Sequence, residues 1–295
     1  MTGPDRRLPV RLTRFGTLLV EGPDARTFLQ GQLSADLDRL EPMQIQPASC
    51  NSVQGRVQAV VWLVDRRDTV VLILPAMLVD AIAARLRKYV LRSKVKVHAG
   101  KLEVYAATGA GAAAPRTHLE IEGASYTRWP GDGERILMLA PATAAAIRDE
   151  GSEFAWQLED IRAGLPQVYP ATSEAFVAQM LNLDLIGAID YQKGCYTGQE
   201  IIARTHFRGT IKRRMLRFSS AAPPPVPGTR ILSAGQHAGD VVDAAATPEG
   251  CELLAVVSLT QADEQLEVDG QPGQRLSRMP LPYAVPETSD GSEET

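Results

Sequence analysis

The stretch KGCYTGQEIIARTHFRG, residues 193–209, sets one cysteine, Cys195, between a lysine and a glycine turn. Just beyond it, Thr197 and Glu200 have the spacing of a capping box. In that motif the hydroxyl accepts a backbone N–H at the start of a helix, and the glutamate reaches back to the first residue. The spacing therefore predicts a helix over residues 198–207.

A thiol in this position can be made reactive. Cys195 would lie two residues before the helix begins, where unpaired backbone N–H groups carry partial positive charge, and Lys193 and Arg204 would add to it. Positive potential favours the thiolate, which is the nucleophilic form of cysteine. Gly194 and Gly198 would allow a sharp turn and the close approach of a ligand. The same residues also suit a small buried cysteine on a tight turn, and the spacing alone does not choose between the two.

Composition narrows the class of protein. The chain has 295 residues, of which 44% are hydrophobic, and a net charge of −4, so we expect a folded globular protein without a global preference for nucleic acid or membrane. The longest apolar run, near residues 57–64, is too short to span a bilayer, and no secretory signal is evident. The three cysteines are widely separated, which indicates a reducing compartment. We therefore expect a cytoplasmic location.

The first half of the chain alternates strands and helices in an order typical of α+β proteins rather than of repeated βαβ units. Two apolar runs flank a polar turn and predict a β-hairpin, and the run KVKVHAGKLEVYAA predicts a second hairpin that turns at Ala99-Gly100. The expected elements are a strand at 17–21, a helix at 24–33, strands at 57–64 and 69–74, a helix from Pro75 to Val90, and the hairpin at 96–107.

The second half combines helices, an irregular segment and a strand-rich end. We expect a strand at 135–139, helices at 143–150 and 154–163, and one short helix at 174–181 in an otherwise irregular segment. After the proline-rich break AAPPPVP, short strands are expected at 229–232, 240–244, 252–259 and 266–268. Their spacing suggests a small antiparallel barrel. The acidic, polar tail from residue 287 onward has the composition of a disordered segment.

Three other features were weighed. Six cations lie between residues 85 and 96, and form either a solvated helix face or a platform for a polyanion such as phosphate, a polyglutamate tail or RNA: Arg85, Arg87, Lys88, Arg92, Lys94 and Lys96. Phe15 and Trp156 could stack on a flat heterocycle or belong to the core. The four histidines are far apart in sequence, so no metal site is predicted.

The block KGCYTGQEIIARTHFRGTIKRR resembles the signature of the YgfZ family, folate-binding proteins related to the aminomethyltransferase (T-protein) of the glycine cleavage system. Weaker segments fall in the order that this family shows: FLQGQLSADL (28–37), ASCNSVQGRV (48–57), DIRAGLP (160–166), MLNLDLIGAIDY (180–191) and PLPY (280–283). The resemblance covers nearly the whole chain.

This resemblance implies a fold, a ligand and a role. The fold would be a T-protein-like three-part ring of two α+β (ferredoxin-like) parts, at 1–110 and 111–210, and a C-terminal antiparallel β-barrel at 211–285, with a tail at 286–295. The cofactor would be tetrahydrofolate or a derivative. The role would be to support iron–sulfur cluster assembly or repair, and through it tRNA modification, with iron–sulfur client or assembly proteins as partners. No membrane partner is implied, and RNA binding would rest on the basic cluster alone.

The family also suggests site residues. Two tryptophans are associated with folate in bacterial members, and Phe15 and Trp156 occupy the matching positions here. Cys195 would be the working thiol with Lys193 beside it. The remaining cofactor-binding positions would be Tyr196, Gln199, Glu200 and Arg204.

Three positions depart from the T-protein. The aspartate that acts on its transferred amine is matched by Gln58 and Ala59, and neither can serve as a carboxylate base. Arg162 stands where a glutamate is expected, and a guanidinium cannot accept hydrogen bonds from a pterin. We therefore expect an accessory role rather than classical catalysis. The alternative is a folate-dependent one-carbon (aminomethyl-type) transferase.

Overall fold

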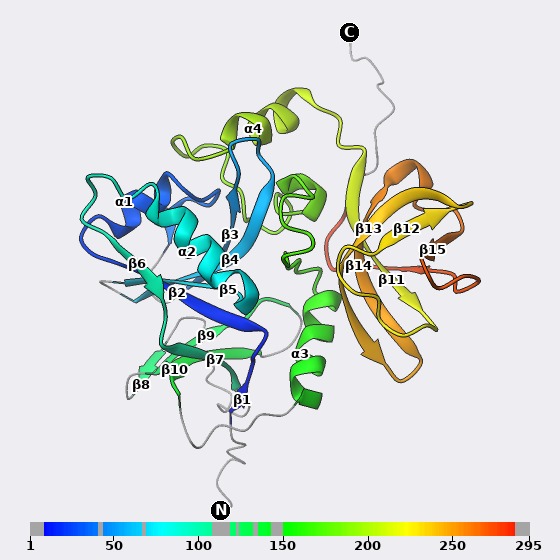
Figure 1. Cartoon of the computed structure of the whole chain (residues 1–295), viewed down its shortest axis with the longest axis horizontal. Helices are drawn as coiled ribbons and strands as arrows, with labels where there is room; N and C mark the ends of the chain where they lie inside the picture. The colour runs from blue at the N-terminus through cyan, green and yellow to red at the C-terminus, as the bar shows by residue number, and fades with distance from the viewer. Residues whose placement is uncertain are drawn as a thin grey trace, which may run out of the picture.

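The computed structural model describes residues 9–40, 44–66, 69–107, 119–121, 124–131, 135–142 and 150–286. Three β-sheets organise these residues, with few helices between them, and the predicted α+β class is confirmed (Figure 1). The helix α3 (Glu150–Arg162) lies between the two N-terminal sheets and the C-terminal sheet, packed along β13 (Gln236–Thr247). The predicted tail from residue 287 and most of the predicted helix at 143–150 lie outside the described residues.

The first sheet contains the predicted hairpin. Its strand order is β3-β4-β5-β2-β6, with bounds β2 (Phe15–Glu21), β3 (Ile45–Asn51), β4 (Val57–Arg66), β5 (Thr69–Pro75) and β6 (Lys96–Ala99). Strands β4 and β5 pair antiparallel up to Arg66 and Thr69, which confirms the hairpin. Both strands are buried on both faces, which explains why they appear in the sequence as continuous apolar runs.

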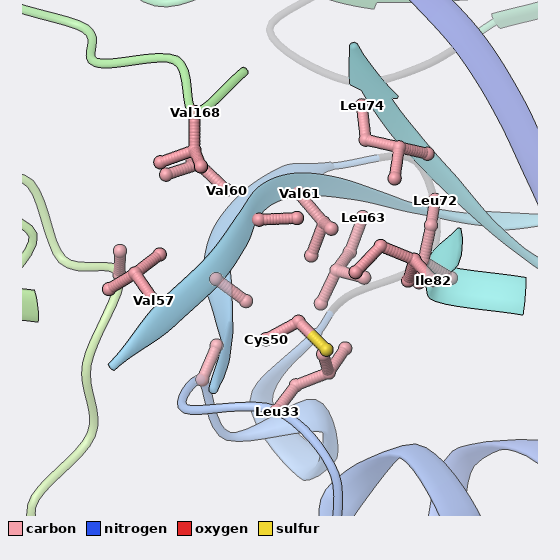
Figure 2. Packing of buried hydrophobic residues seen from close by; sticks show 14 of the residues in the cluster. Leu33, Cys50, Val57, Val60, Val61, Leu63, Leu72, Leu74, Ile82 and Val168 are labelled. Atoms are coloured by element: carbon pink, nitrogen blue, oxygen red, sulfur yellow. The ribbon is translucent and has the colours of Figure 1, made fainter. Parts of the chain in front are cut away.

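Helices cover one face of this sheet. They are α1 (Ala25–Gln30), the 3₁₀ turn η2 (Ala76–Leu78) and α2 (Val79–Arg87). Along β4, Val61 and Leu63 enter the core under these helices, whereas Trp62 and Val64 enter the core on the opposite face. Figure 2 shows the helix-side core, in which Leu63, Leu72 and Ile82 gather near the buried sulfur of Cys50.

The second sheet packs against that opposite face. Its strand order is β1-β7-β10-β9-β8, with bounds β1 (Val10–Arg11), β7 (Leu102–Ala107), β8 (Leu119–Ile121), β9 (Ala124–Arg128) and β10 (Ile136–Pro141). Val104 and Leu137 of this sheet share a core with Trp62 of the first. The sheet takes strands from both sides of residue 110, and the domain boundary placed there stays a prediction.

The second predicted hairpin is wrong. Strand β6 pairs with β2 of the first sheet, and β7 pairs with β1 and β10 of the second. The chain changes sheets at Gly100, whose N–H donates to the Thr17 carbonyl at 2.7 Å, and the Thr17 hydroxyl donates to the Leu102 carbonyl at 2.7 Å. A Cβ at Gly100 would lie 2.1 Å from that hydroxyl oxygen, so only glycine allows this crossing.

The long segment between α3 and α4 (Gln199–Arg208) is mostly irregular. Gly164, at φ +67°, follows the end of α3 as predicted. The helix predicted at 174–181 is wrong: only the 3₁₀ turn η3 (Ala178–Leu181) forms. Glu174 has φ +64° and donates its N–H to the Val57 carbonyl, so this residue pairs with β4 instead of starting a helix.

The third sheet forms the C-terminal part. Its strand order is β15-β12-β13-β14-β11-β16, and it curls around its own core (Figure 1). The bounds are β11 (Arg213–Ser220), β12 (Arg230–Ser233), β13 (Gln236–Thr247), β14 (Gly250–Ser258), β15 (Leu266–Val268) and β16 (Ser277–Met279). The four predicted strands are confirmed, and β11 and β16 were not predicted. Among the described residues, no helix is long and apolar enough to cross a membrane.

Candidate functional site at the Cys195 turn

The chain around Cys195 is tied by hydrogen bonds to the turn that follows α1. The Asp190 N–H donates to the Ser34 carbonyl at 3.0 Å, and the Thr197 N–H donates to the Gly31 carbonyl at 3.2 Å. The Ser34 hydroxyl donates to the Ala188 carbonyl at 2.6 Å. These bonds hold an irregular segment in one conformation on both sides of the cysteine.

A local turn within this segment aims the lysine side chain. One carboxylate oxygen of Asp190 accepts the N–H groups of Gln192 and Lys193, at 2.7 and 3.0 Å. This is an Asx turn, which an aspartate favours because its short side chain reaches the backbone two residues on. Sequence reasoning passed over Asp190, although an Asp four residues before Gly194 is a usable signal for such a turn.

Lys193 inserts its ammonium group into a ring of backbone carbonyls. Nζ donates to the carbonyls of Gln30, Leu33 and Ala35 at 2.8, 2.8 and 2.6 Å. Burial lowers the pKa of Lys193 to about 8, while Asp36 acts in the opposite direction. All three ammonium protons have acceptors, so Lys193 positions the turn in this structure.

Cys195 itself is exposed and unpaired, whereas Cys50 and Cys251 are buried free cysteines. Burial raises the pKa of the Cys50 and Cys251 thiols. Of the two interpretations left open by the spacing, the small buried cysteine is therefore wrong. The chain places one thiol at the surface and encloses the other two.

The predicted capping box does not form. Helix α4 begins at Gln199, and its N-cap is Gly198, with no side-chain hydrogen bond at the cap. The Thr197 N–H was expected to donate to the Glu200 side chain, but it donates to the Gly31 carbonyl instead. This hydrogen bond to the turn after α1 therefore takes the place of the bond that the capping box would have made.

Gly198 is required where two motif segments meet. Its φ is +83°, and a Cβ there would lie 2.5 Å from the Ser52 carbonyl oxygen and 3.1 Å from the Gly55 Cα. Gly55, at φ +70°, in turn packs against Ile201 of α4. By contrast, a Cβ on Gly194 would meet nothing within 4 Å. The Cys195 turn thus rests on the turn between β3 and β4.

The other residues predicted near the Cys195 thiol differ in how far their side chains are exposed. Tyr196 is buried in the helix-side core, its ring lies 5.1 Å from the Lys193 ammonium, and its hydroxyl has no hydrogen-bond partner. Gln199 is half-buried, and Glu200 and Arg204 are exposed on α4. The surface around Cys195 is therefore polar, over an apolar support.

Known proteins match this chain over nearly its whole length. It is 30% identical to the tRNA-modifying protein YgfZ of Edwardsiella ictaluri. The alignment is 314 residues long and covers 94% of this chain and 94% of the relative. The tRNA-modifying protein YgfZ of Klebsiella pneumoniae is also 30% identical, over 95% of this chain and 94% of that protein. The chain belongs to the YgfZ family. A scan against family profiles finds no match.

The solved structure of glycine cleavage system aminomethyltransferase T from Bartonella henselae shares the fold. It superimposes with a TM-score of 0.74 at 17% identity, over 94% of this chain and 86% of that chain. The T-protein-like fold expected for a YgfZ protein is therefore confirmed.

Phe15 and Trp156, the two aromatic residues predicted to contact folate, lie in a packed core. Trp129 lies between them, with ring centroids 5.6 Å from Phe15 and 6.0 Å from Trp156. Phe15 and Trp156 are 6% and 7% exposed, so neither offers an open face. They belong to the core between the first two sheets, whereas Tyr196 belongs to the helix-side core, so the first sheet separates the aromatic pair from the residue next to Cys195.

Arg14, which sequence reasoning missed, joins the three parts of this YgfZ protein. Its Nη2 donates to the Tyr169 hydroxyl at 2.6 Å and to an Asp243 carboxylate oxygen at 2.8 Å. Its backbone N–H donates to Glu153 of α3 at 2.6 Å. Its buried Nη1 has no hydrogen-bond partner among the described residues and lies 3.9 Å from an Asp160 carboxylate oxygen. Its guanidinium also lies 5.2 Å from the Phe15 ring. No local pattern in the sequence signals a junction built from such distant residues.

A cavity of about 440 Å³ opens beside Arg14. Arg14, Glu153 and Gln157 supply its polar groups, and the largely exposed side chains of Met77 and Phe154 supply apolar ones. Its size falls in the range of small-molecule sites.

The positions that depart from the T-protein are engaged elsewhere. The Gln58 amide donates to Glu174 at 2.7 Å, and Ala59 is fully buried. Arg162 binds Glu252 at 2.9 Å, and Arg217 shares the same carboxylate at 2.6 Å. Across the described ranges, no group of three or more metal-ligating side chains is found.

Proposed function

We propose that this protein is a folate-binding accessory factor that supports iron–sulfur cluster assembly or repair, and through it tRNA modification, with Cys195 as its working thiol. The observation that carries the proposal is the exposed Cys195 on a turn held by the Lys193 carbonyl ring. Relatives named tRNA-modifying protein YgfZ, similar along nearly the whole chain, support the link to tRNA modification.

A single exposed thiol suits an accessory role. Protein-bound iron–sulfur clusters are usually held by several cysteines, and the other two cysteines of this chain are buried in separate cores. Cys195 would therefore meet a labile cluster together with ligands from a client protein, or attack a partner's disulfide, forming a mixed disulfide and releasing the partner's second thiolate. Both uses need the sulfur at the surface.

The Arg14 cavity is the place we propose for tetrahydrofolate. The ligand combines a flat, amphipathic ring system with an anionic tail, and this cavity combines apolar side chains with the half-buried Arg14 guanidinium. Among the described residues its Nη1 has no hydrogen-bond partner, and an Asp160 carboxylate oxygen lies 3.9 Å away. Phe15 and Trp156 would support the cavity from the core behind it. A folate derivative that carries a one-carbon unit would supply that unit when bound. Tyr196, Gln199, Glu200 and Arg204 would then belong to the thiol turn rather than to the folate.

The transferase alternative is not favoured by the geometry. At the position where the T-protein has a catalytic aspartate, the Gln58 amide is bound to Glu174 and Ala59 lies in the core. Neither side chain can accept a proton from an amine.

Complementation tests the role of the thiol. A bacterial strain deleted for its own YgfZ protein is supplied with wild type, Cys195→Ser or Cys251→Ala, and the amount of thiomethylated tRNA is measured. We expect wild type and the Cys251 variant to restore the modification and Cys195→Ser to stay at the level of the deletion strain. Full restoration by a well-expressed Cys195→Ser protein would remove the thiol from the proposal.

Folate binding is tested separately by calorimetric titration with a reduced folate. Phe154→Ala should weaken binding by about 5-fold or more, because it removes an aromatic face from the cavity without opening the core. The control is Tyr89→Ala, a partly exposed aromatic far from this cavity in the fold. No measurable binding by wild type would remove the folate from the proposal.

A further inference from the structure

Helix α4 ends in a surface that lies beyond the Cys195 turn and shares only Arg204 with the residues assigned to that turn. We call it the α4-end surface and define it by Tyr191, Arg204, His206, Phe207, Arg208 and Lys212. It combines aromatic rings with cations on a chain whose net charge is −4. Tyr191 is partly buried and packs against the helix-side core, whereas the other five side chains are exposed, so the core does not explain them.

The rings form an open stack. His206 lies parallel to Tyr191, with centroids 3.8 Å apart and an interplanar angle of 15°. Phe207 meets His206 edge-on at 4.7 Å. Phe207 is 68% exposed, so the cluster presents an aromatic ring to solvent instead of burying it. An exposed ring held by two neighbours is a ready platform for another flat group.

Among the described residues, the cations of this surface have no carboxylate partners. Arg204, Arg208 and Lys212 are exposed, and within the described part of the chain no ion pair engages them. By contrast, the next two cations are neutralised, since Arg213 pairs with Asp240 at 3.0 Å and Arg214 with Asp184 at 2.7 Å. Within α4 the one carboxylate is Glu200, a turn before Arg204. Arg208 lies in the last turn of α4, where its positive charge stabilises the negative end of the helix dipole. That role does not explain Lys212 or the ring stack.

A cavity of about 430 Å³ lies beside the rings. Tyr191 and His206 form part of its wall, and Thr205 and Thr210 add hydroxyl groups. The wall also includes the Asp184–Arg214 ion pair, and the volume is within the range of sites that hold small ligands. The surface therefore offers phosphate-binding charge, a stacking face and a hollow in one place.

The basic cluster at 85–96 is a weaker candidate for the same chemistry. The Arg85 guanidinium donates to the Asn51 carbonyl at 2.7 Å, and Arg87 donates to the Val97 carbonyl at 2.8 Å. Two of its six cations thus help to hold the chain. The observations favour the end of α4.

We propose that the α4-end surface binds single-stranded RNA, with Arg204, Arg208 and Lys212 on phosphates and the Phe207 ring against a base. Stacking on an exposed ring requires an unpaired base, because paired bases in a duplex are already stacked. This inference goes beyond the proposed function and does not depend on the Cys195 thiol.

The first test is the salt dependence of binding, measured by the fluorescence anisotropy of a labelled single-stranded RNA of about 12 nucleotides. Three phosphate contacts predict a slope of log K against log salt of about −2, between about 50 and about 200 mM salt. Replacing Arg204, Arg208 and Lys212 together by Gln should abolish this dependence. The control, Arg92→Gln with Lys94→Gln, removes two exposed charges elsewhere and should change little.

The second test separates RNA from other polyanions. Phe207→Ala should weaken RNA binding by about 5- to 150-fold and leave heparin binding unchanged, because heparin has no bases. Phe154→Ala, which removes another exposed aromatic, should leave RNA binding unchanged. Cys195→Ser should bind RNA like wild type, which separates this result from that of the complementation. The proposal is overturned by absent RNA binding at low salt, by a loss in the control variants equal to that in the surface variants, or by an equal effect of Phe207→Ala on RNA and heparin.

Discussion

Replacing Lys193 by methionine tests whether the carbonyl ring holds the Cys195 turn. The substitution keeps most of the side-chain volume and removes an ammonium that donates to three carbonyls. Two of these carbonyls, of Leu33 and Ala35, take part in buried hydrogen bonds and would lose their partner. Each orphaned buried acceptor costs about 1–3 kcal/mol, so the loss is about 2–6 kcal/mol.

The variant also removes the cost of burying a charge. Burial lowers the pKa of Lys193 to about 8, so part of the loss is offset. We therefore expect the free energy of unfolding to fall by about 2–4 kcal/mol, which is the lower part of the range of about 2–6 kcal/mol given above. The measurement is urea denaturation of the native chain, followed by tryptophan fluorescence. Lys88→Met, which removes an exposed ammonium, is the control and should cost less than about 0.5 kcal/mol.

The loosened turn should also be visible locally. Hydrogen exchange of the amides of Asp190 and Thr197 should accelerate in Lys193→Met, because their acceptors lie on the same turn after α1. If both stability and exchange match those of Lys88→Met, the carbonyl ring is not what positions the thiol. A change confined to the pH dependence of thiol reactivity would instead make Lys193 an electrostatic activator of Cys195.

The glycine contacts, the ion-pair cluster and the thiols each allow a separate test. Gly198→Ala, at φ +83° and 2.5 Å from a carbonyl, should destabilise by about 2 kcal/mol or more, while Gly194→Ala, with nothing within 4 Å, should stay within about 0.5 kcal/mol; equal denaturation curves would contradict the packing. Burial acts to raise the pKa of Glu252, but hydrogen bonds from Arg162 and Arg217 hold it below the ordinary 4.5. Glu252→Gln should therefore cost about 1–3 kcal/mol at neutral pH, with the difference shrinking as the pH falls below 4.5; a constant difference in acid unfolding would refute this. Native protein should react with a thiol reagent at Cys195 alone, and a second fast thiol would contradict the burial of the other two.

How far the fold could be predicted depended on whether the signal was local. The hairpin of β4 and β5 was predicted because two apolar runs flank a short polar turn, and the same signal located four strands of the third sheet. The run at 96–107 carries a similar pattern, yet its halves join different sheets. That choice is made by Thr17, about 80 residues away, which binds both sides of the Gly100 crossing.

In the candidate site, too, local signals could be predicted and contacts between distant residues could not. The residue types around Cys195 indicated a thiol in a special setting, and its exposure agrees with that prediction. The local capping signal failed because a carbonyl from the α1 turn takes the Thr197 N–H. The partners of Lys193 could not be predicted, since backbone carbonyls about 160 residues earlier leave no mark in side-chain identity. Aromatic residues occur both in open ligand sites and in packed cores. The residue types of Phe15 and Trp156 alone therefore could not show which of the two they form.

The most direct measurement is a chemical block of the working thiol. Native protein is treated with iodoacetamide, mass spectrometry confirms modification at Cys195, and the product is added to an extract that lacks the YgfZ protein. The rate at which a cluster-dependent tRNA-modifying enzyme recovers activity is then followed. We expect recovery with untreated protein and none with alkylated protein. Equal recovery with both would contradict this expectation.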